Sequence, residues 1–159
     1  MISIKYNKEK NKFFEEKRVV NSGIIIFNKD KILLIKRKDK KHWELPGGKV
    51  KLIDQGKTKK DTLKNAAIRE VFEEVGLKPR IITRYSPFYI DFTTPDNVKR
   101  RSYNFIAESS KIGEIKEKNL FSDIKYFSVL DLDKGKYRLA PNVITLKELF
   151  KTDFFKYKF

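Results

Sequence analysis

Apolar and polar positions alternate in short blocks along the first third of the chain. Two apolar runs rich in β-branched residues, 19–27 and 32–35, are separated by the polar residues 28–31. Such a pair of runs on either side of a short polar turn predicts a β-hairpin. Residues 42–50 follow, and the proline and two glycines among them predict a loop. Residues 1–18, before the hairpin, are polar and rich in lysine.

Residues 61–75 have a helical period instead. At about 100° per residue, the apolar side chains fall within one arc of the helix and three glutamates fall on the opposite side. The apolar arc consists of Ile68, Val71, Phe72 and Val75, and the acidic side consists of Glu70, Glu73 and Glu74. Asp61 or Thr62 can cap the start of this helix, and Gly76 suits its end.

The second half of the chain is predicted to contain mainly β-structure. Residues 80–92, 100–109 and 124–132 are rich in β-branched and aromatic side chains, which favour strands. Residues 141–151 predict a closing helix, with Asn142 as its cap.

Composition limits the kinds of partner and of metal site that the protein can have. The chain holds 37 lysines and arginines against 21 acidic residues, which gives a formal net charge of +16 at pH 7. A charge of this size attracts polyanions, which include nucleic acid, anionic membrane surfaces and phosphorylated small molecules. Many of the lysines also suit a simple solvated surface. The chain has no cysteine, which excludes disulfides and thiolate metal sites.

No internal repeat or linker divides the sequence, so we expect a single domain over residues 1–159 with its core at about 19–150. The first residues lack the apolar core of a signal peptide, and no apolar run approaches the roughly 20 residues that span a bilayer. We therefore expect a cytoplasmic protein without a membrane partner, as a monomer or a homodimer.

The three clustered glutamates are the strongest chemical signal. Glu70 and Glu74 are four residues apart, where like charges on a helix cost roughly 0.2–0.5 kcal/mol, although Arg69 and Glu73 at the same spacing recover a similar amount. A solvated helix face does not need this clustering. Carboxylates on one face are the ligands that Mg²⁺ or Mn²⁺ requires, and either cation can bridge them to substrate phosphates.

The residues around these glutamates resemble a known motif. REVFEEVGL, residues 69–77, is similar to the second half of the Nudix box, whose pattern is Gly, five residues, Glu, seven residues, then Arg-Glu-apolar-x-Glu-Glu-x-Gly-apolar. All seven specified positions of that half are met. WELPGGKV, residues 43–50, resembles the approach to the box. The resemblance covers residues 19–150 and implies the α/β class and the Nudix fold, an α/β/α sandwich with a mixed β-sheet.

The first half of the box departs from the pattern. Its glycine should lie fourteen residues before the arginine, but Gly48 lies 21 residues before Arg69, which indicates about seven extra residues within 51–60. Counted back eight residues from Arg69, Asp61 takes the place of the first Glu. We therefore expect Asp61 to orient the site, with a side chain one methylene shorter than that of Glu.

The resemblance also implies a chemistry: hydrolysis of a pyrophosphate bond in a nucleoside diphosphate-linked substrate, with Mg²⁺ or Mn²⁺ as cofactor. It implies that Glu73 and Glu74 are metal ligands, that Glu70 is a ligand or the base, and that the Gly48 carbonyl is a further ligand. Arg69 would fix a neighbouring carboxylate. These are the catalytic and metal-binding residues expected from the motif.

A later glutamate often serves the family as a base or a metal ligand. Glu108, Glu114 and Glu117 are the candidates, and Glu117 is favoured because it precedes the strand predicted at 124–132. An ordinary exposed glutamate explains it as well.

The substrate is less well defined by the sequence. A nucleoside triphosphate of MutT type is favoured, with a dinucleoside polyphosphate or ADP-ribose as alternatives. Asn142 resembles the asparagine that reads a purine in such enzymes, although its role as a cap explains it equally. Tyr85 could stack on a base, although an aromatic residue in a strand is often part of the core. The basic sequence VKRR at 98–101 also suits a nucleic-acid or nucleotide-binding module with weakened catalysis.

Overall fold

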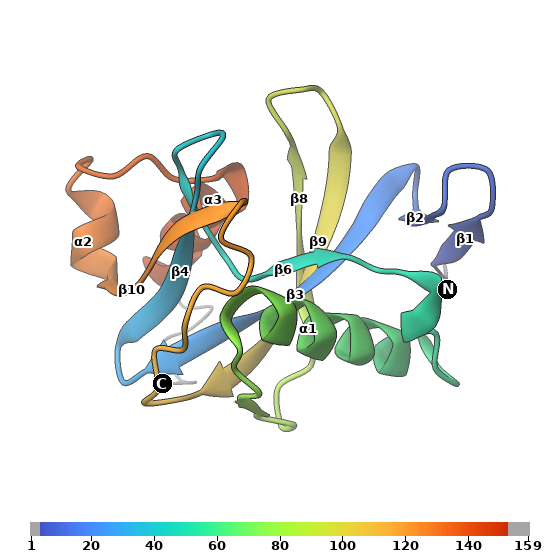
Figure 1. The fold of residues 1–159 in the computed structure, drawn as a ribbon, viewed down its shortest axis with the longest axis horizontal. Coiled ribbons are helices and arrows are strands. Elements are labelled where there is room, and N and C mark those ends of the chain that lie inside the picture. Colours follow the sequence, from blue (N-terminus) through green and yellow to red (C-terminus); the bar gives the residue numbers. More distant parts are fainter. Residues whose placement is uncertain (1–3, 153–159) are drawn as a thin grey trace.

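The structure is a computed structural model that describes residues 4–152; residues 1–3 and 153–159 of the predicted domain lie outside the described part. The chain forms a mixed sheet with helices on both sides (Figure 1). The strands are β1 (Lys5–Asn7), β2 (Lys12–Glu15), β3 (Arg18–Asn28), β4 (Lys31–Arg37), β5 (Trp43–Glu44), β6 (Gly47–Lys49), β7 (Arg80–Ile81), β8 (Phe88–Thr93), β9 (Lys99–Glu108) and β10 (Phe121–Ser128). The helices are the 3-10 turn η1 (Leu52–Asp54), α1 (Lys59–Val75), α2 (Val129–Asp133) and α3 (Pro141–Phe150).

The long strand β3 organises the sheet. It pairs in parallel with β9, from Val19 opposite Arg100 to Phe27 opposite Glu108, and antiparallel with β2, β4 and β6. β4 and β10 extend the sheet on one side, and β8 pairs with the far edge of β9. The predicted hairpin is confirmed as β3 and β4.

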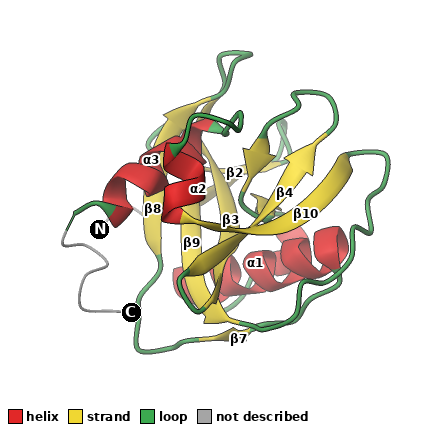
Figure 2. Ribbon diagram, turned by 90° about the vertical axis from the view of Figure 1, so that its left-hand side faces the viewer, coloured by secondary structure: helices red, strands yellow, loops and turns green. Residues whose placement is uncertain are grey.

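The two faces of β3 belong to two separate hydrophobic clusters. Ile24 and Ile26 pack with the buried side chains of α1, whereas Ile25 and Phe27 pack with those of α2 and α3. Side chains alternate between the faces of a strand, so a continuous apolar run is needed when helices cover both faces. Figure 2 shows α1 on one side of the sheet and α2 and α3 on the other. The prediction of an α/β/α sandwich with a mixed sheet is confirmed.

Helix α1 starts earlier than expected. Its cap is Thr58, whose hydroxyl accepts a hydrogen bond of 3.1 Å from the Asp61 backbone N–H. The prediction of Asp61 or Thr62 as the cap is therefore wrong. The end is as predicted, because Gly76 adopts the left-handed conformation, with φ of 69°, that a residue with a side chain rarely adopts.

The buried face of α1 is rotated relative to the predicted arc. Val71 and Val75 are fully buried as expected, but Phe72 is 46% exposed. Glu70 and Glu74, expected on the polar side, are only 9% and 4% exposed. This face of the helix rests against the backbone of β6, which supplies polar partners for carboxylates as well as surface to bury.

Two strands also differ from expectation. Residues 80–92 do not form one strand but the short β7 and the separate β8. The strand expected at 124–132 runs instead from Phe121 to Ser128. It stops there because the Ser128 hydroxyl accepts a hydrogen bond from the Asp131 backbone N–H and begins the helix α2.

The lysine-rich start of the chain is part of the fold. β1 and β2 form an antiparallel hairpin on the edge of β3, and Phe13 from it is 4% exposed in the cluster under α1. The core thus begins before residue 19. Between Lys5 and Lys17 only Phe13 and Glu15 are buried, so this segment has no apolar run that would predict its strands. Within residues 4–152, no helix is long and apolar enough to cross a bilayer.

Candidate active site

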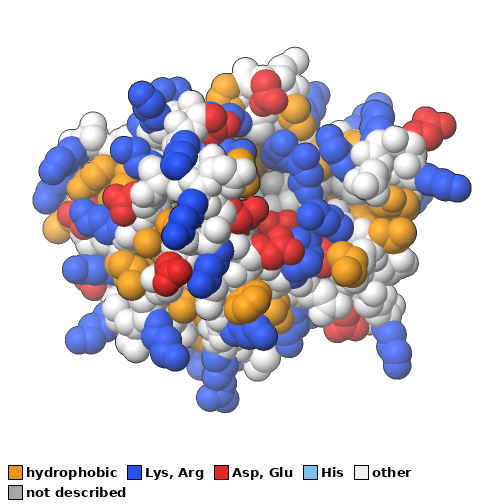
Figure 3. Space-filling view, viewed as in Figure 1, with side chains coloured by type: hydrophobic (Ala, Val, Ile, Leu, Met, Phe, Trp, Pro, Cys, Tyr) orange, Lys and Arg blue, Asp and Glu red, His pale blue; other side chains and the backbone are white. Residues whose placement is uncertain are grey.

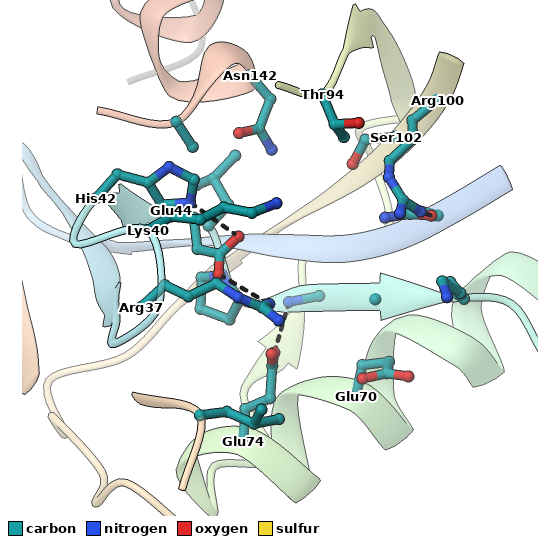
Figure 4. A pocket seen from close by; sticks show the side chains of 18 of the residues that line it. Arg37, Lys40, His42, Glu44, Glu70, Glu74, Thr94, Arg100, Ser102 and Asn142 are labelled. Atoms are coloured by element: carbon teal, nitrogen blue, oxygen red, sulfur yellow. Dashed lines mark hydrogen bonds and ion pairs between the residues drawn. The ribbon is translucent and has the colours of Figure 1, made fainter. Parts of the chain in front are cut away.

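A cavity of about 350 Å³ lies where α1, β6, β9 and the start of α3 meet. Its size is within the range of small-molecule sites, ~300–1,000 Å³. Figure 4 shows Glu70 and Glu74 on α1 beneath β6, with Thr94, Arg100 and Ser102 across the cavity and Asn142 above it. Figure 3 shows acidic side chains gathered near the centre of one face of the molecule, with lysines and arginines around them.

The glycine pair of β6 allows α1 to approach the sheet. A side chain at Gly48 would bring its Cβ to 2.5 Å from the Glu70 Cδ atom and would displace that carboxylate from its present position. The Gly47 backbone N–H donates a hydrogen bond of 2.7 Å to Glu74 Oε1. The two buried carboxylates are therefore held against the backbone of β6.

Arg69 holds three carboxylates together. Its guanidinium forms a bidentate pair with Asp54, with Nε to Oδ1 at 2.7 Å and Nη2 to Oδ2 at 2.8 Å. Its Nη1 also donates to Glu70 Oε1 at 2.9 Å and to Glu73 Oε2 at 3.1 Å. The predicted pairing of Arg69 with a neighbouring carboxylate is seen here, and Asp54 is a partner that the sequence motif did not predict.

Asp54, not Asp61, lies against Arg69. Asp54 is 3% exposed and its Oδ2 also accepts a hydrogen bond of 2.8 Å from the Lys51 backbone N–H. Asp61 is exposed in the first turn of α1. Counted forward from Gly48, five residues separate the glycine from Asp54, as the box requires. The insertion therefore falls between Asp54 and Arg69, and counting forward as well as back would have found it.

Burial shifts the acidity of the glutamates that face β6. Burial raises the pKa of Glu74 well above its usual range, against the opposing hydrogen bond from the Gly47 N–H. The nearby carboxylates Glu70, Glu44 and Glu117 raise it further. Burial also raises the pKa of Glu70, which Arg69 opposes. Negative charge at this place is costly for the chain alone, and a bound cation would offset that cost.

The donors here are carboxylates and a backbone carbonyl, which are the oxygen ligands that a hard cation takes, and the Glu70 carboxylate lies directly against the backbone of Gly48. Within the described part of the chain, no three Asp, Glu or His side chains converge on one point. Glu70 and Glu73 instead point to Arg69, and Glu74 points to Gly47.

Of the predicted site residues that follow the motif in the sequence, some line the cavity and others do not. Glu117 lines the cavity, and its carbonyl accepts hydrogen bonds from the Leu120 and Phe121 backbone N–H groups, which fixes the turn before β10. Glu108 and Glu114 are not among the described residues that line this cavity, and neither is Tyr85.

Asn142 is not a helix cap. The residue at the cap of α3 is Ala140, and Pro141 fills the first helical position, where a missing N–H has no consequence. Asn142 is 9% exposed and lines the cavity. The prediction of a cap is wrong, and the alternative role in reading a purine stays a prediction.

Three buried polar atoms at the cavity lack a hydrogen-bond partner within the described residues: His42 Nε2, Glu44 Oε1 and Asn104 Oδ1. The sequence pattern placed His42 in a predicted loop and did not single out the other two. A signal was present, because Ser102 and Asn104 alternate with Tyr103 and Phe105 and so share a polar face of β9.

Comparisons with known proteins agree with this architecture. The family described as NUDIX domain matches residues 17–149, so the chain belongs to the NUDIX family, as the motif predicted. A putative 8-oxo-dGTP diphosphatase of Bacillus subtilis (strain 168) is 43% identical over 53 residues, which are 33% of this chain and 31% of that protein. An RNA pyrophosphohydrolase of Aeromonas hydrophila is 41% identical over 64 residues, 40% of this chain and 33% of that protein.

Among solved structures, the MutT NUDIX hydrolase of Burkholderia pseudomallei superimposes with a TM-score of 0.63 and 24% identity, covering 81% of this chain and 95% of that one. This likeness concerns the fold. The matches to the two curated relatives span about a third of their length.

Proposed function

We propose that the protein is a hydrolase that cleaves a pyrophosphate bond in a nucleoside diphosphate-linked substrate, with Mg²⁺ or Mn²⁺ as cofactor. The observation that carries this proposal is the set of glutamates on α1. Glu70 and Glu74 are buried against the glycine pair of β6 in a chain of net charge +16. Membership of the NUDIX family supports the same chemistry.

In this proposal Glu70, Glu73 and Glu74 hold the cation together with the Gly48 carbonyl. The bound cation supplies neutralisation of the substrate phosphates and a water of lowered pKa. Arg69 positions Glu70 and Glu73 through the hydrogen bonds described above. Glu70 or Glu117 accepts the proton of the attacking water, since both line the cavity.

For the substrate we favour a nucleoside triphosphate. The name of the Bacillus subtilis relative, a putative 8-oxo-dGTP diphosphatase, supports this choice. Asn142 lies at the end of the cavity away from the carboxylates, where its amide can donate to and accept from a base. Phe92, which lines the cavity from β8, is better placed than Tyr85 to contact that base. Dinucleoside polyphosphates and ADP-ribose are the alternatives.

The test is a panel of nucleotides with product identification, with and without Mg²⁺ or Mn²⁺. We expect turnover only with the cation, and Glu73→Gln should lower kcat by roughly two orders of magnitude or more, because a ligand to the charge-stabilising cation is lost. Glu114→Gln is the control, since Glu114 is an exposed glutamate with its side chain 70% accessible and lies outside the cavity lining. Full activity of Glu73→Gln contradicts the metal assignment.

A second candidate is a nucleotide or nucleic-acid binding module with weakened catalysis. The net charge of +16 and the engagement of Glu70 and Glu73 by Arg69 favour it. Such a module would bind RNA with a steep salt dependence and release no phosphate from any member of the panel.

A further inference from the structure

The cavity has a second wall of opposite charge. Lys40, Lys49, Lys51 and Arg100 line it, and we call these four residues the cation wall. Within residues 4–152, none of their side chains forms an ion pair. Arg37, which also lines the cavity, does have such a partner, and so do Lys59 and Arg69.

Arg100 and its neighbour Arg101 differ in their partners. The two side chains point to opposite faces of β9. Arg101 is 4% exposed and binds Glu15 at 2.9 Å and Asp91 at 2.8 Å. Arg100 is half-buried and points into the cavity, and its one side-chain hydrogen bond to another described residue is a long one, 3.4 Å to Asn21 Oδ1. Its remaining donors are available to an anion.

The sheet register places two members of the wall on the same face. Asn21 of β3 lies opposite Lys49 of β6 on one side and opposite Ser102 of β9 on the other. Arg100 is two residues before Ser102 and so shares its face. Lys49 and Arg100 therefore flank Asn21 on the side of the sheet opposite α1 and its glutamates.

The charges around Arg100 favour the binding of an anion at the cation wall. Burial lowers the pKa of Arg100 and the nearby Arg37 lowers it further, whereas the carboxylates of Asp96 and Glu44 oppose the shift. Cations held together in a partly buried site repel one another, and a multiply charged anion between them relieves that repulsion.

We propose that Lys49 and Arg100 bind phosphate groups beyond the bond that is cleaved, so that the site prefers a 5′-triphosphate to a substrate with only two phosphates between two sugars. The inference rests on the proposed function, because it takes the carboxylates of α1 as the place of hydrolysis. The acidic wall and its cation would engage the phosphates at the cleaved bond, and the cation wall would neutralise the additional charge. A 5′-triphosphate occurs on free nucleotides and at the 5′ end of RNA, and both present the same chemistry here.

The first experiment measures binding without turnover. Inorganic triphosphate is titrated into the protein by calorimetry in the presence of EDTA. We expect Lys49→Gln/Arg100→Gln to weaken binding by at least about tenfold, because two charge-assisted contacts are lost. The matched control is Lys78→Gln/Arg80→Gln, which removes the same charge from two exposed residues near the opposite end of β9. Equal affinities of the two double variants would overturn the proposal.

The second experiment uses Mg²⁺ and two substrates, GTP and ADP-ribose. We expect the Lys49/Arg100 double variant to lose at least about tenfold in kcat/KM on GTP and less than about threefold on ADP-ribose, mainly through KM. Equal losses on both substrates would overturn the selectivity. If the wild type hydrolyses neither, the proposed function fails, while the binding experiment still decides whether the wall recognises a triphosphate.

The source of the triphosphate is settled by a third arm. Competition of 5′-triphosphorylated and 5′-monophosphorylated RNA against GTP is measured for the wild type and the double variant. Competition by the triphosphorylated RNA that the double variant loses supports the wall as a site for RNA ends. If neither RNA competes with GTP, while the double variant still binds GTP more weakly than the wild type does, the wall is a site for free nucleotides. If triphosphorylated and monophosphorylated RNA compete equally well, the proposal is contradicted both for RNA ends and for free nucleotides.

Discussion

Arg69 determines where three carboxylates lie. Its guanidinium is only partly exposed, with 18% of the side chain accessible, and hydrogen bonds to Asp54 and then to Glu70 raise its pKa above the usual range, against the effect of burial. Asp54 takes two of the five donors in a planar, bidentate pair. Nη1 donates to Glu70 and Glu73, and Nη2 also donates to the Lys49 carbonyl. A substitution at Asp54 should therefore change the positions of Glu70 and Glu73, which Asp54 does not contact, through Arg69.

We expect Asp54→Asn to lower kcat by about 10–100-fold, the usual effect of losing a residue that orients metal ligands. The neutral amide cannot form the bidentate pair, so Arg69 would move toward Glu70 and Glu73 and compete with the cation for them. The expected readout is a higher Mg²⁺ concentration for half-maximal activity. Asp61→Asn is the matched control, and a loss there as large as at Asp54 would show that Asp61 orients the site after all.

Glu74 predicts a pH dependence of stability in the metal-free protein. Burial raises its pKa in the folded state, so its contribution is favourable below the unfolded pKa and is lost as pH rises through the folded pKa. We expect Glu74→Gln to raise Tm in EDTA at pH 8 but much less at pH 4, while retaining an acceptor for the Gly47 N–H. Thermal unfolding at both pH values decides this, and an unchanged Tm at pH 8 would contradict a costly buried charge.

The hairpin β1–β2 is fixed to the domain by a buried polar network. Glu15 is 3% exposed and accepts hydrogen bonds from Arg101, Tyr103 and Lys59, which come from β9 and the first turn of α1. A buried carboxylate of this kind is stable only with all its partners. The network therefore links the start of the chain to the helix that holds the site.

Glu15→Ala should reduce the free energy of unfolding by about 3–5 kcal/mol, because it leaves the buried Arg101 without its innermost partner. Glu16→Ala is the comparison, since Glu16 contacts the same arginine at 3.2 Å with 48% of its side chain exposed. That variant should lose less than about 1 kcal/mol. Urea unfolding measures both, and similar losses would mean that the network is not the main attachment of the hairpin.

The elements show which features a sequence pattern can predict. The hairpin β3–β4 and the C-terminal end of α1 follow from apolar runs and from Gly76, which act locally. The rotation of α1 does not, because Glu70 and Glu74 become buried only when the glycines of β6 fold against them. The motif singled out the glutamates that line the cavity, whereas the long-range pair of Asp54 with Arg69 and the position of Asn142 at the cavity depend on tertiary contacts.

Charge is distributed unevenly over the whole molecule. A net charge of +16 surrounds a small group of carboxylates, so the long-range field attracts anions while these carboxylates are the proposed site of a cation. Attraction over such distances is screened by salt, with a Debye length of roughly 10 Å at 0.1 M ionic strength. It acts on the rate of substrate capture more than on the chemical step.

Raising NaCl from about 50 to 300 mM should therefore lower kcat/KM for a triphosphate by about tenfold and leave kcat nearly unchanged, because screening weakens capture but not the bound complex. The slope of log kcat/KM against log salt should be shallower in Lys49→Gln/Arg100→Gln than in the equally charged Lys78→Gln/Arg80→Gln, since the first pair lines the cavity and the second does not. Steady-state kinetics over a salt series measures both slopes. Equal slopes would mean that the field arises from the total charge and that the placement of cations at the cavity adds nothing to capture.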